Sequence, residues 1–214
     1  MARKAVAQEL SRERILEEAR QLFAEHGYHT LTMRSIAKAM GYSHGALYYH
    51  FKEKAELFYA LVNQDFQMLL DRQKEMLSRT RMGDLGQLER LMLEFIRFGL
   101  ENPYHYEIMF MINDSDLQLY ARTEQAQCLE LFATVIRSVI ARHPGNEQMM
   151  YSMPWSLFMS MHGFISYNIR YRQSFADVKK LAEQHVKYLC SGLTPASAAQ
   201  PVPQQSPQLV HVAL

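Results

Sequence analysis

The sequence predicts an all-α fold. Apolar residues recur at helical spacing through most of the 214 residues, and no strand-like alternation competes with that pattern. Glycine and proline are few, and four of the seven prolines fall in the last twenty residues. A chain that is 48% apolar and 21% charged has an ordinary globular composition. We therefore expect an N-terminal three-helix unit, joined by a long helix to a larger helical unit.

The first helix is predicted from Ser11 to Gly27. Ser11 is placed to cap the amino end, and Gly27 is placed to end the helix in a conformation that other residues avoid. Between them the apolar positions repeat every three or four residues, as one buried helical face requires. These positions are Ile15, Leu16, Ala19, Leu22, Phe23 and His26.

Two short helices are predicted next. Thr32 caps a helix that ends at Gly41, and Ser43 caps the helix after it. An apolar residue precedes each cap and can pack onto the helix as a hydrophobic staple, which pairs Leu31 with Ile36 and Tyr42 with Leu47. Two short helices joined across residues 41–43 form a helix-turn-helix.

A long helix is predicted over residues 53–79, with a length of roughly 40 Å at 1.5 Å per residue. Breaks such as Asn102-Pro103 and His143-Pro144-Gly145 then divide the chain into further helices. The expected segments are 88–100, 103–111, 117–142, 146–170 and 175–191. We predict a flexible arm over 1–10, a helix-turn-helix domain over 11–56, a helical domain over 57–193 and a disordered tail over 194–214.

Residues 22–57, LFAEHGYHTLTMRSIAKAMGYSHGALYYHFKEKAEL, resemble the N-terminal pattern of the TetR family of transcriptional regulators. The resemblance covers about a fifth of the chain. It implies a homodimer that presents one helix-turn-helix per subunit to a palindromic operator in double-stranded DNA. It also implies a C-terminal domain that responds to a small apolar or amphipathic effector, most often in a repressor. Tyr42 departs from the family, in which valine is usual at this position.

The helix 44–50 carries the predicted DNA contacts. Leu47 and Phe51 share one face and must pack inward, which leaves the other rings facing outward. The N-terminal residues of a recognition helix lie at base edges, which places His44, Gly45 and Ala46 there. By resemblance to the family, Tyr48, His50 and Lys54 contact phosphates, and Tyr49 contacts either a phosphate or a base. The candidate DNA-binding residues are Thr32, Arg34, Ser43, His44, Gly45, Ala46, Tyr48, Tyr49, His50 and Lys54.

The charge distribution agrees with a polyanion at this end of the chain. Residues 1–54 hold nine Lys or Arg and six Asp or Glu, a net charge of +3, whereas the remainder holds fourteen and sixteen, a net charge of −2. A solvated helical face often carries such a charge, so the count alone does not identify a nucleic-acid site.

The C-terminal half is apolar and rich in methionine, a side chain that adapts to an irregular pocket. We predict an apolar cavity for a ligand, although any single one of these residues can instead be ordinary core. The predicted ligand-binding residues are Phe95, Met109, Phe110, Phe132, Trp155, Phe158, Met159 and His162. His162 suits a polar anchor in that cavity, and equally a core histidine bonded to a neighbouring group.

The last helix has a one-sided apolar stripe. The family's last two helices pair with those of a second subunit, which implies that this stripe is the dimer interface; packing within one subunit produces the same pattern. The predicted interface residues are Val178, Leu181, Ala182, His185, Val186 and Leu189.

Several other functions lack sequence support. Cys128 and Cys190 lie far apart without metal-ligand spacing, and no motif of a zinc enzyme or dinucleotide enzyme occurs. We predict no enzyme activity, no cofactor and no metal. The amino terminus lacks the apolar run of a secretory signal, and residues 149–169 contain Pro154 and four serines, so we expect a cytoplasmic protein without a membrane span. A metal-responsive or partner-regulated DNA-binding protein is the alternative.

Overall fold

The computed structural model describes residues 9–78, 83–112, 115–141 and 149–193. Within those ranges the chain forms nine helices and no strand, as predicted. The helices are α1 (Arg12–His26), α2 (Met33–Ala39), α3 (His44–His50), α4 (Lys54–Ser78), α5 (Leu85–Glu101), α6 (Pro103–Phe110), α7 (Ser115–Ile140), α8 (Met149–Arg170) and α9 (Phe175–Ser191). The predicted tail and most of the predicted arm lie outside the described residues.

Local capping sets the boundaries of the first two helices. The Ser11 side chain accepts a hydrogen bond from the Arg14 amide, and Gly27 ends α1 with a φ of 76°. Thr32 and Ser35 form a reciprocal capping box at the start of α2. Gly41, with a φ of 77°, turns the chain toward α3. Each of these signals is local, which is why the sequence predicts them well.

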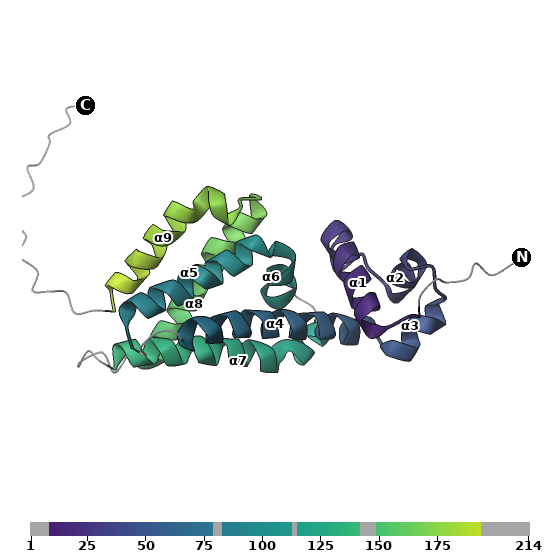
Figure 1. The fold of residues 1–214 in the computed structure, drawn as a ribbon, viewed down its shortest axis with the longest axis horizontal. Coiled ribbons are helices and arrows are strands. Elements are labelled where there is room, and N and C mark those ends of the chain that lie inside the picture. The colour runs from purple at the N-terminus through teal and green to yellow at the C-terminus, as the bar shows by residue number, and fades with distance from the viewer. Residues whose placement is uncertain (1–8, 79–82, 113–114, 142–148, 194–214) are drawn as a thin grey trace, which may run out of the picture.

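Helices α1, α2 and α3 form a small unit at one end of the molecule (Figure 1). Its core is built from side chains that are at most 4% exposed, and both residues of the predicted α2 staple belong to it. The core residues include Ile15, Phe23, Leu31, Ile36, Leu47 and Phe51. A compact core of this size fixes α3 rigidly, so that its other faces point outward.

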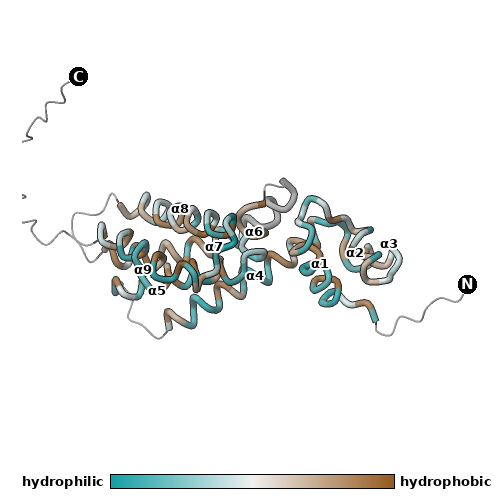
Figure 2. Tube along the Cα trace, turned by 90° about the horizontal axis from the view of Figure 1, so that it is seen from above, coloured by the Kyte–Doolittle hydropathy of each residue, from teal (hydrophilic) through white to brown (hydrophobic). Residues whose placement is uncertain are grey.

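Helix α4 runs from this unit into the larger helical bundle, where it packs along α7 (Figure 1). Its 25 residues match the predicted long helix to within one residue at each end. Helix α5 packs against both α8 and α9, and α6 packs on α4 and α5. Figure 2 shows apolar and polar segments alternating along these helices, as one-sided apolar stripes require.

The helices α5 and α8 approach closely at Gly99. A Cβ atom at this position would lie 2.6 Å from Ile165 Cγ2 and 3.0 Å from Tyr106 Cδ2. Only a residue without a side chain fits there, so Gly99 sets the distance between the two helices. None of the helices in the described ranges is both long enough and apolar enough to cross a membrane.

Candidate nucleic-acid interface and effector pocket

Helix α3 divides its side chains by face. Leu47 and the following Phe51 are at most 1% exposed, as predicted, whereas Tyr49 is 88% exposed and Tyr48 is 44% exposed. A ring as exposed as that of Tyr49 adds almost nothing to the core of its own domain, and close to half of the Tyr48 side chain also faces solvent. The two tyrosines are therefore displayed on the surface by a helix that Leu47 holds in place.

The exposed rings of α3 contact their neighbours on the helix. His44 and Tyr48 lie edge to face, with ring centroids 4.7 Å apart, and Tyr49 and His50 are arranged in the same way at 5.4 Å. The His50 backbone carbonyl accepts a hydrogen bond from Arg12 Nη1, which ties the end of α3 to the start of α1. The rings thus have a defined surface arrangement before any partner arrives.

The predicted caps of α2 and α3 differ in how they use their hydroxyl groups. Thr32 Oγ1 accepts a hydrogen bond from the Ser35 amide at 3.0 Å, so this hydroxyl is part of the capping box. Ser43 occupies the N-cap position of α3 but makes no side-chain capping bond. The exposed Ser43 hydroxyl is consequently not used to stabilise the helix that it precedes.

Lys54 has a structural contact that the sequence did not reveal. Its ammonium group donates to the Tyr28 backbone carbonyl at 2.7 Å and lies 3.8 Å from the centre of the Tyr28 ring. This contact attaches the first turn of α4 to the segment between α1 and α2. The half-buried lysine is thereby held near the surface that α3 presents.

The exposed surface around α3 suits a nucleic acid. Neither α2 nor α3 contains an acidic residue, and the exposed Arg34 and Lys38 lie on α2. An α-helix fits the major groove of B-DNA, where small residues such as Gly45 and Ala46 allow close approach to the bases. The predicted DNA-binding residues from Ser43 to His50 lie along this single helix and its cap, with Arg34 on the helix before it and Lys54 on the helix after it.

The predicted cavity of the C-terminal domain is largely filled by side chains. The rings of Phe95, Phe110, Phe158 and His162 contact one another and the buried Tyr106, with centroid separations from 4.8 to 6.5 Å. Met109 is 1% exposed within the same core. These five predicted ligand residues therefore pack as core, because Tyr106 and its aromatic neighbours occupy the space.

His162 is satisfied inside this cluster rather than turned toward a cavity. Its Nδ1 lies 2.7 Å from the Tyr106 hydroxyl, and its ring stacks on Phe158. Burial lowers the pKa of His162 from its ordinary value, since a buried imidazole is harder to protonate. Burial also raises the pKa of Tyr106 well above its usual range. The pair is a neutral hydrogen bond within the core.

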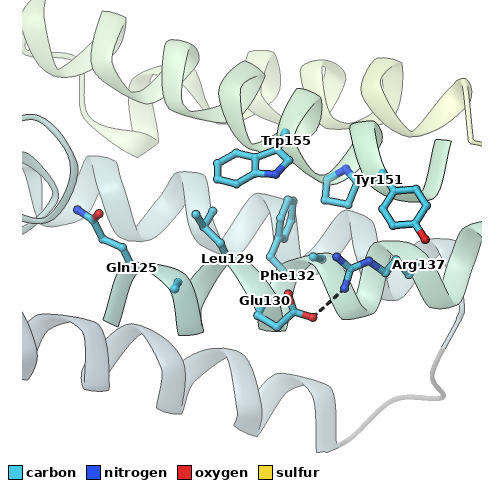
Figure 3. A pocket seen from close by; sticks show the side chains of 10 residues that line it. Gln125, Leu129, Glu130, Phe132, Arg137, Tyr151 and Trp155 are labelled. Carbon is cyan, nitrogen blue, oxygen red and sulfur yellow. Dashed lines mark hydrogen bonds and ion pairs between the residues drawn. The ribbon is translucent and has the colours of Figure 1, made fainter. Parts of the chain in front are cut away.

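A cavity of about 350 Å³ lies instead between α7 and α8. Figure 3 shows Leu129 and Phe132 rising from α7 toward Trp155, which comes from α8. Glu130 and Arg137 form an ion pair of 2.7 Å at the wall of the cavity. The lining residues are Gln125, Ala126, Leu129, Glu130, Phe132, Ala133, Arg137, Tyr151, Pro154 and Trp155.

This cavity combines an apolar interior with a polar rim. Leu129, Phe132 and Pro154 supply apolar surface, and the rim carries a charged pair, an amide and a phenol. Trp155 is 54% exposed and Tyr151 is 82% exposed, so the cavity opens toward solvent beside α8. Of the eight predicted ligand residues, Phe132 and Trp155 line it, whereas Met159 is exposed elsewhere on α8.

The stripe on α9 faces its own subunit. Val178, Ala182 and Val186 are at most 9% exposed because α9 packs on α5, and these predicted interface residues are therefore already covered. His185 stacks on Phe164 of α8, with ring centroids 5.0 Å apart, and Leu189 packs against the core. Leu181 is 55% exposed and differs from the other five in pointing outward. The alternative of packing within one subunit accounts for most of the stripe.

Sequence reasoning missed a polar junction between helices distant in the chain. Arg20 on α1 contacts the buried Asp65 on α4, and His105 on α6 contacts both of them. No local sequence pattern indicates such a cluster, because Arg20 is 45 residues from Asp65 and 85 residues from His105. Within the described ranges, no group of three His, Cys, Asp or Glu side chains is placed to hold a metal ion.

The exposed recognition helix and the all-helical C-terminal domain define a two-domain helix-turn-helix DNA-binding regulator. Residues 15–61 match the family model described as bacterial regulatory proteins, tetR family. Residues 88–189 match the tetracyclin repressor-like C-terminal domain. The chain is 31% identical to the HTH-type transcriptional repressor AcnR of Corynebacterium glutamicum over 165 residues, which is 73% of this chain and 80% of that protein.

A further relative and two solved structures are similar to the chain, the two structures in fold. The HTH-type transcriptional regulator UidR of Escherichia coli is 33% identical over 106 residues, covering 44% of this chain and 54% of UidR. The repressor NalD of Pseudomonas aeruginosa superposes with a TM-score of 0.66 at 24% identity, over 86% of this chain and 98% of NalD. The regulator KstR2 of Mycobacterium tuberculosis gives a TM-score of 0.63 at 19% identity, over 89% and 99% of the two chains.

The chain belongs to the TetR family of transcriptional regulators. It is accordingly a DNA-binding regulator and not an enzyme. In a helix-turn-helix the second helix of the motif is the one that enters the major groove, and in this chain that helix is α3.

Proposed function

We propose that the protein is a homodimeric repressor that binds a palindromic operator and is released by a small apolar or amphipathic effector. The observation that carries this proposal is the exposed face of α3. Tyr49 is 88% exposed on a helix that the core residue Leu47 holds rigidly, and no acidic side chain lies on α2 or α3 to repel phosphates.

On DNA, the start of α3 lies in the major groove. Gly45 and Ala46 permit close approach to the bases, and the His44 ring nitrogens reach a base edge. Tyr48, Tyr49 and His50 lie further along the helix and contact the phosphates that border the groove. Thr32, Arg34, Ser43 and Lys54 bind the backbone on either side, which fixes the position of α3 in the groove.

The second subunit packs on the outer faces of α8 and α9. Four large side chains there, Tyr167, Tyr171, Leu181 and Tyr188, are between 55% and 77% exposed. Gly163 has no neighbour within 4 Å of where its Cβ would lie, which leaves room for a helix from another subunit. An exposed apolar surface of this kind is typical of a protein interface.

The effector binds in the cavity between α7 and α8. Its volume of about 350 Å³ falls in the range of small-molecule sites, and its lining combines apolar walls with a few polar groups. A bound effector changes the distance between the two recognition helices. A dimer binds its operator only when these helices lie about 34–36 Å apart or a multiple of that distance.

Selection of bound DNA from a random pool tests the operator and the dimer together. We expect a consensus with twofold symmetry and half-sites one helical turn, or a multiple, apart. His44→Ala should relax base preference at one position in each half-site, because it removes a base-edge contact. A wild-type consensus without symmetry, or an unchanged consensus for His44→Ala, would contradict the proposal.

The single tryptophan of the chain makes the effector site directly testable. Because Trp155 lines the cavity, a ligand bound there changes its fluorescence. Native mass spectrometry of freshly purified protein should detect an organic molecule bound to the dimer. Protein that holds a ligand and still binds operator with the affinity of ligand-free protein would refute release by an effector.

A further inference from the structure

The cavity between α7 and α8 has an apolar middle and a charged end. Phe132 of α7 faces Trp155 of α8 across the middle, so two aromatic side chains flank the space between the helices (Figure 3). Arg137 and Tyr151 lie at one end of the cavity, whereas Gln125 lies at the other (Figure 3). The charged and the apolar groups are thus separated along the length of one site.

The lining of the cavity extends along a considerable part of α7. From Gln125 to Arg137 the helix rises roughly 18 Å, at 1.5 Å per residue. The volume of the cavity is about 350 Å³, which over that length leaves a narrow space. A molecule that fills it is therefore elongated, and the polar group of that molecule belongs at the Arg137 end.

Arg137 is the charged side chain that such a molecule meets. The side chain of Arg137 is 37% exposed, whereas that of Glu130, its ion-pair partner, is 65% exposed and mostly in water. The contact between them joins one nitrogen, Nη1, to one oxygen, Oε1, at 2.7 Å. A guanidinium carries five N–H donors, so a single contact of this kind leaves donors for a second anion.

The exposure of the two partners favours an anionic ligand over a cationic one. A partly exposed ion pair contributes little to stability, so displacing Glu130 from Arg137 costs little. A ligand carboxylate that accepts two parallel hydrogen bonds from the guanidinium forms a stronger pair than the one it replaces. A cationic ligand would instead have to replace Arg137 beside a carboxylate that already faces water.

We propose that the cavity binds a carboxylic acid with an elongated aromatic body. The carboxylate pairs with Arg137, and the Tyr151 hydroxyl at the same end of the cavity donates a further hydrogen bond to it. The aromatic body lies between Phe132 and Trp155, where ring–ring contacts add to the burial of apolar surface. The inference rests on the effector site proposed above and narrows its ligand to one charge and one shape.

Three probes of one shape and different charge test this inference. Biphenyl-4-carboxylate is negative, biphenyl-4-carboxamide is neutral and 4-phenylbenzylamine is positive at pH 7. Isothermal titration calorimetry of the full-length protein gives the affinity of each. We expect the carboxylate to bind at least tenfold more tightly than the other two, because only the carboxylate makes charge-assisted bonds to Arg137. Equal affinity for carboxylate and amide, preference for the amine, or binding of none of the three would overturn the inference.

Substitutions of the ion pair should act in opposite directions. Arg137→Gln should weaken carboxylate binding about tenfold and leave amide binding unchanged, and the retained amide binding shows that the cavity is intact. Glu130→Gln removes the competing carboxylate and should tighten carboxylate binding about two- to threefold. The matched control is Arg90→Gln, which removes a cation from the exposed ion pair with Asp84 and should leave all three affinities unchanged.

Two results with these variants would contradict the assignment of Arg137. One is an equal loss of carboxylate and amide affinity in Arg137→Gln, since the residue would then act on the shape of the cavity and not on the charge of the ligand. The other is weaker carboxylate binding by Glu130→Gln, since the two carboxylates would then not compete for one guanidinium.

Operator affinity in the presence of each probe separates this inference from the proposed function. We expect saturating biphenyl-4-carboxylate to weaken operator binding. If the carboxylate binds through Arg137 and operator affinity is unchanged, the charge selectivity stands and release by an effector in this cavity is refuted. If the amide or the amine weakens operator binding and the carboxylate does not, release by an effector stands and the charge selectivity is refuted.

Discussion

The Tyr106 hydroxyl lies 2.7 Å from His162 Nδ1 in the aromatic core of the C-terminal domain. Burial lowers the pKa of His162 from its ordinary value of 6.5, so the unfolded chain takes up a proton that the folded chain resists. The contribution of His162 to the free energy of unfolding is therefore fully present above pH 6.5. It is lost as the pH drops from 6.5 toward the folded-state pKa. We expect a lower melting temperature at pH 5.5 than at pH 7.5.

The histidine responsible can be identified by substitution. His162→Gln retains a hydrogen-bonding group for Tyr106 but cannot be protonated in this range, so its melting temperature should depend less on pH. His29→Gln, at an exposed position, is the control and should keep the wild-type dependence. Superimposable pH profiles for His162→Gln and the wild type would show that this contact does not govern acid stability.

Gly99→Ala should destabilise the fold by about 1–3 kcal/mol, because the added methyl group overpacks the contact with Ile165 and Tyr106. The higher helix propensity of alanine, worth about 1 kcal/mol relative to glycine, offsets part of this loss. Gly45→Ala is the matched control, because Gly45 is also helical but no atom lies within 4 Å of the Cβ that alanine would add. This change should raise stability slightly. Urea titration of both variants measures the difference, and an equal or higher midpoint for Gly99→Ala would contradict the expectation.

Both cysteines should be unreactive in the folded protein. Cys128 and Cys190 are free thiols, at most 2% exposed, and burial raises the pKa of each to about 12. At pH 8 only about one thiol in ten thousand is then a thiolate, the reactive form. A maleimide should label neither residue in native protein and both in urea. Stoichiometric labelling of the native state would show that one of the two sites opens.

Local interactions explain how much of this fold was predictable. Ser11, Gly27, Thr32 and Gly41 act on residues within four positions of themselves, so their signals are readable in the sequence. The recognition helix is equally local, since Leu47 and Phe51 alone determine which face of α3 is buried. The candidate DNA-binding surface followed from that one assignment and from the family resemblance.

Tertiary packing explains why the sequence did not predict the position of the cavity or the role of the α9 stripe. The cavity lies between α7 and α8 because Tyr106 fills the aromatic cluster around Phe95 and His162, and no periodicity indicates which gap between helices is filled. The α9 stripe was ambiguous for a related reason. A partner subunit and the neighbouring α5 both require apolar residues at the same spacing. The identity of Val186 therefore does not indicate which of the two it contacts.

Two substitutions at the DNA-binding surface should separate charge from hydrogen bonding. Lys54→Gln removes a cation while keeping a donor for the Tyr28 carbonyl, so it should weaken binding to all DNA sequences and reduce the salt slope by about one per subunit. Tyr49→Phe removes only a neutral hydroxyl and should weaken binding about three- to tenfold with an unchanged slope. Fluorescence anisotropy across a salt series measures both, and an unchanged slope for Lys54→Gln would exclude its phosphate contact.

The two faces of α9 lead to opposite outcomes for the same substitution. Leu181→Glu places a charge on the exposed face, where the proposed partner subunit packs, so we expect folded monomers that bind operator at least tenfold more weakly than the wild type. Val186→Glu places the charge in the contact with α5, where the side chain is 2% exposed, and should unfold the domain instead. Sedimentation velocity gives the subunit state, and circular dichroism gives the helix content of each variant. A Leu181→Glu protein that stays dimeric would exclude the outer face of α9 as the interface, because a carboxylate buried between two subunits would not be tolerated.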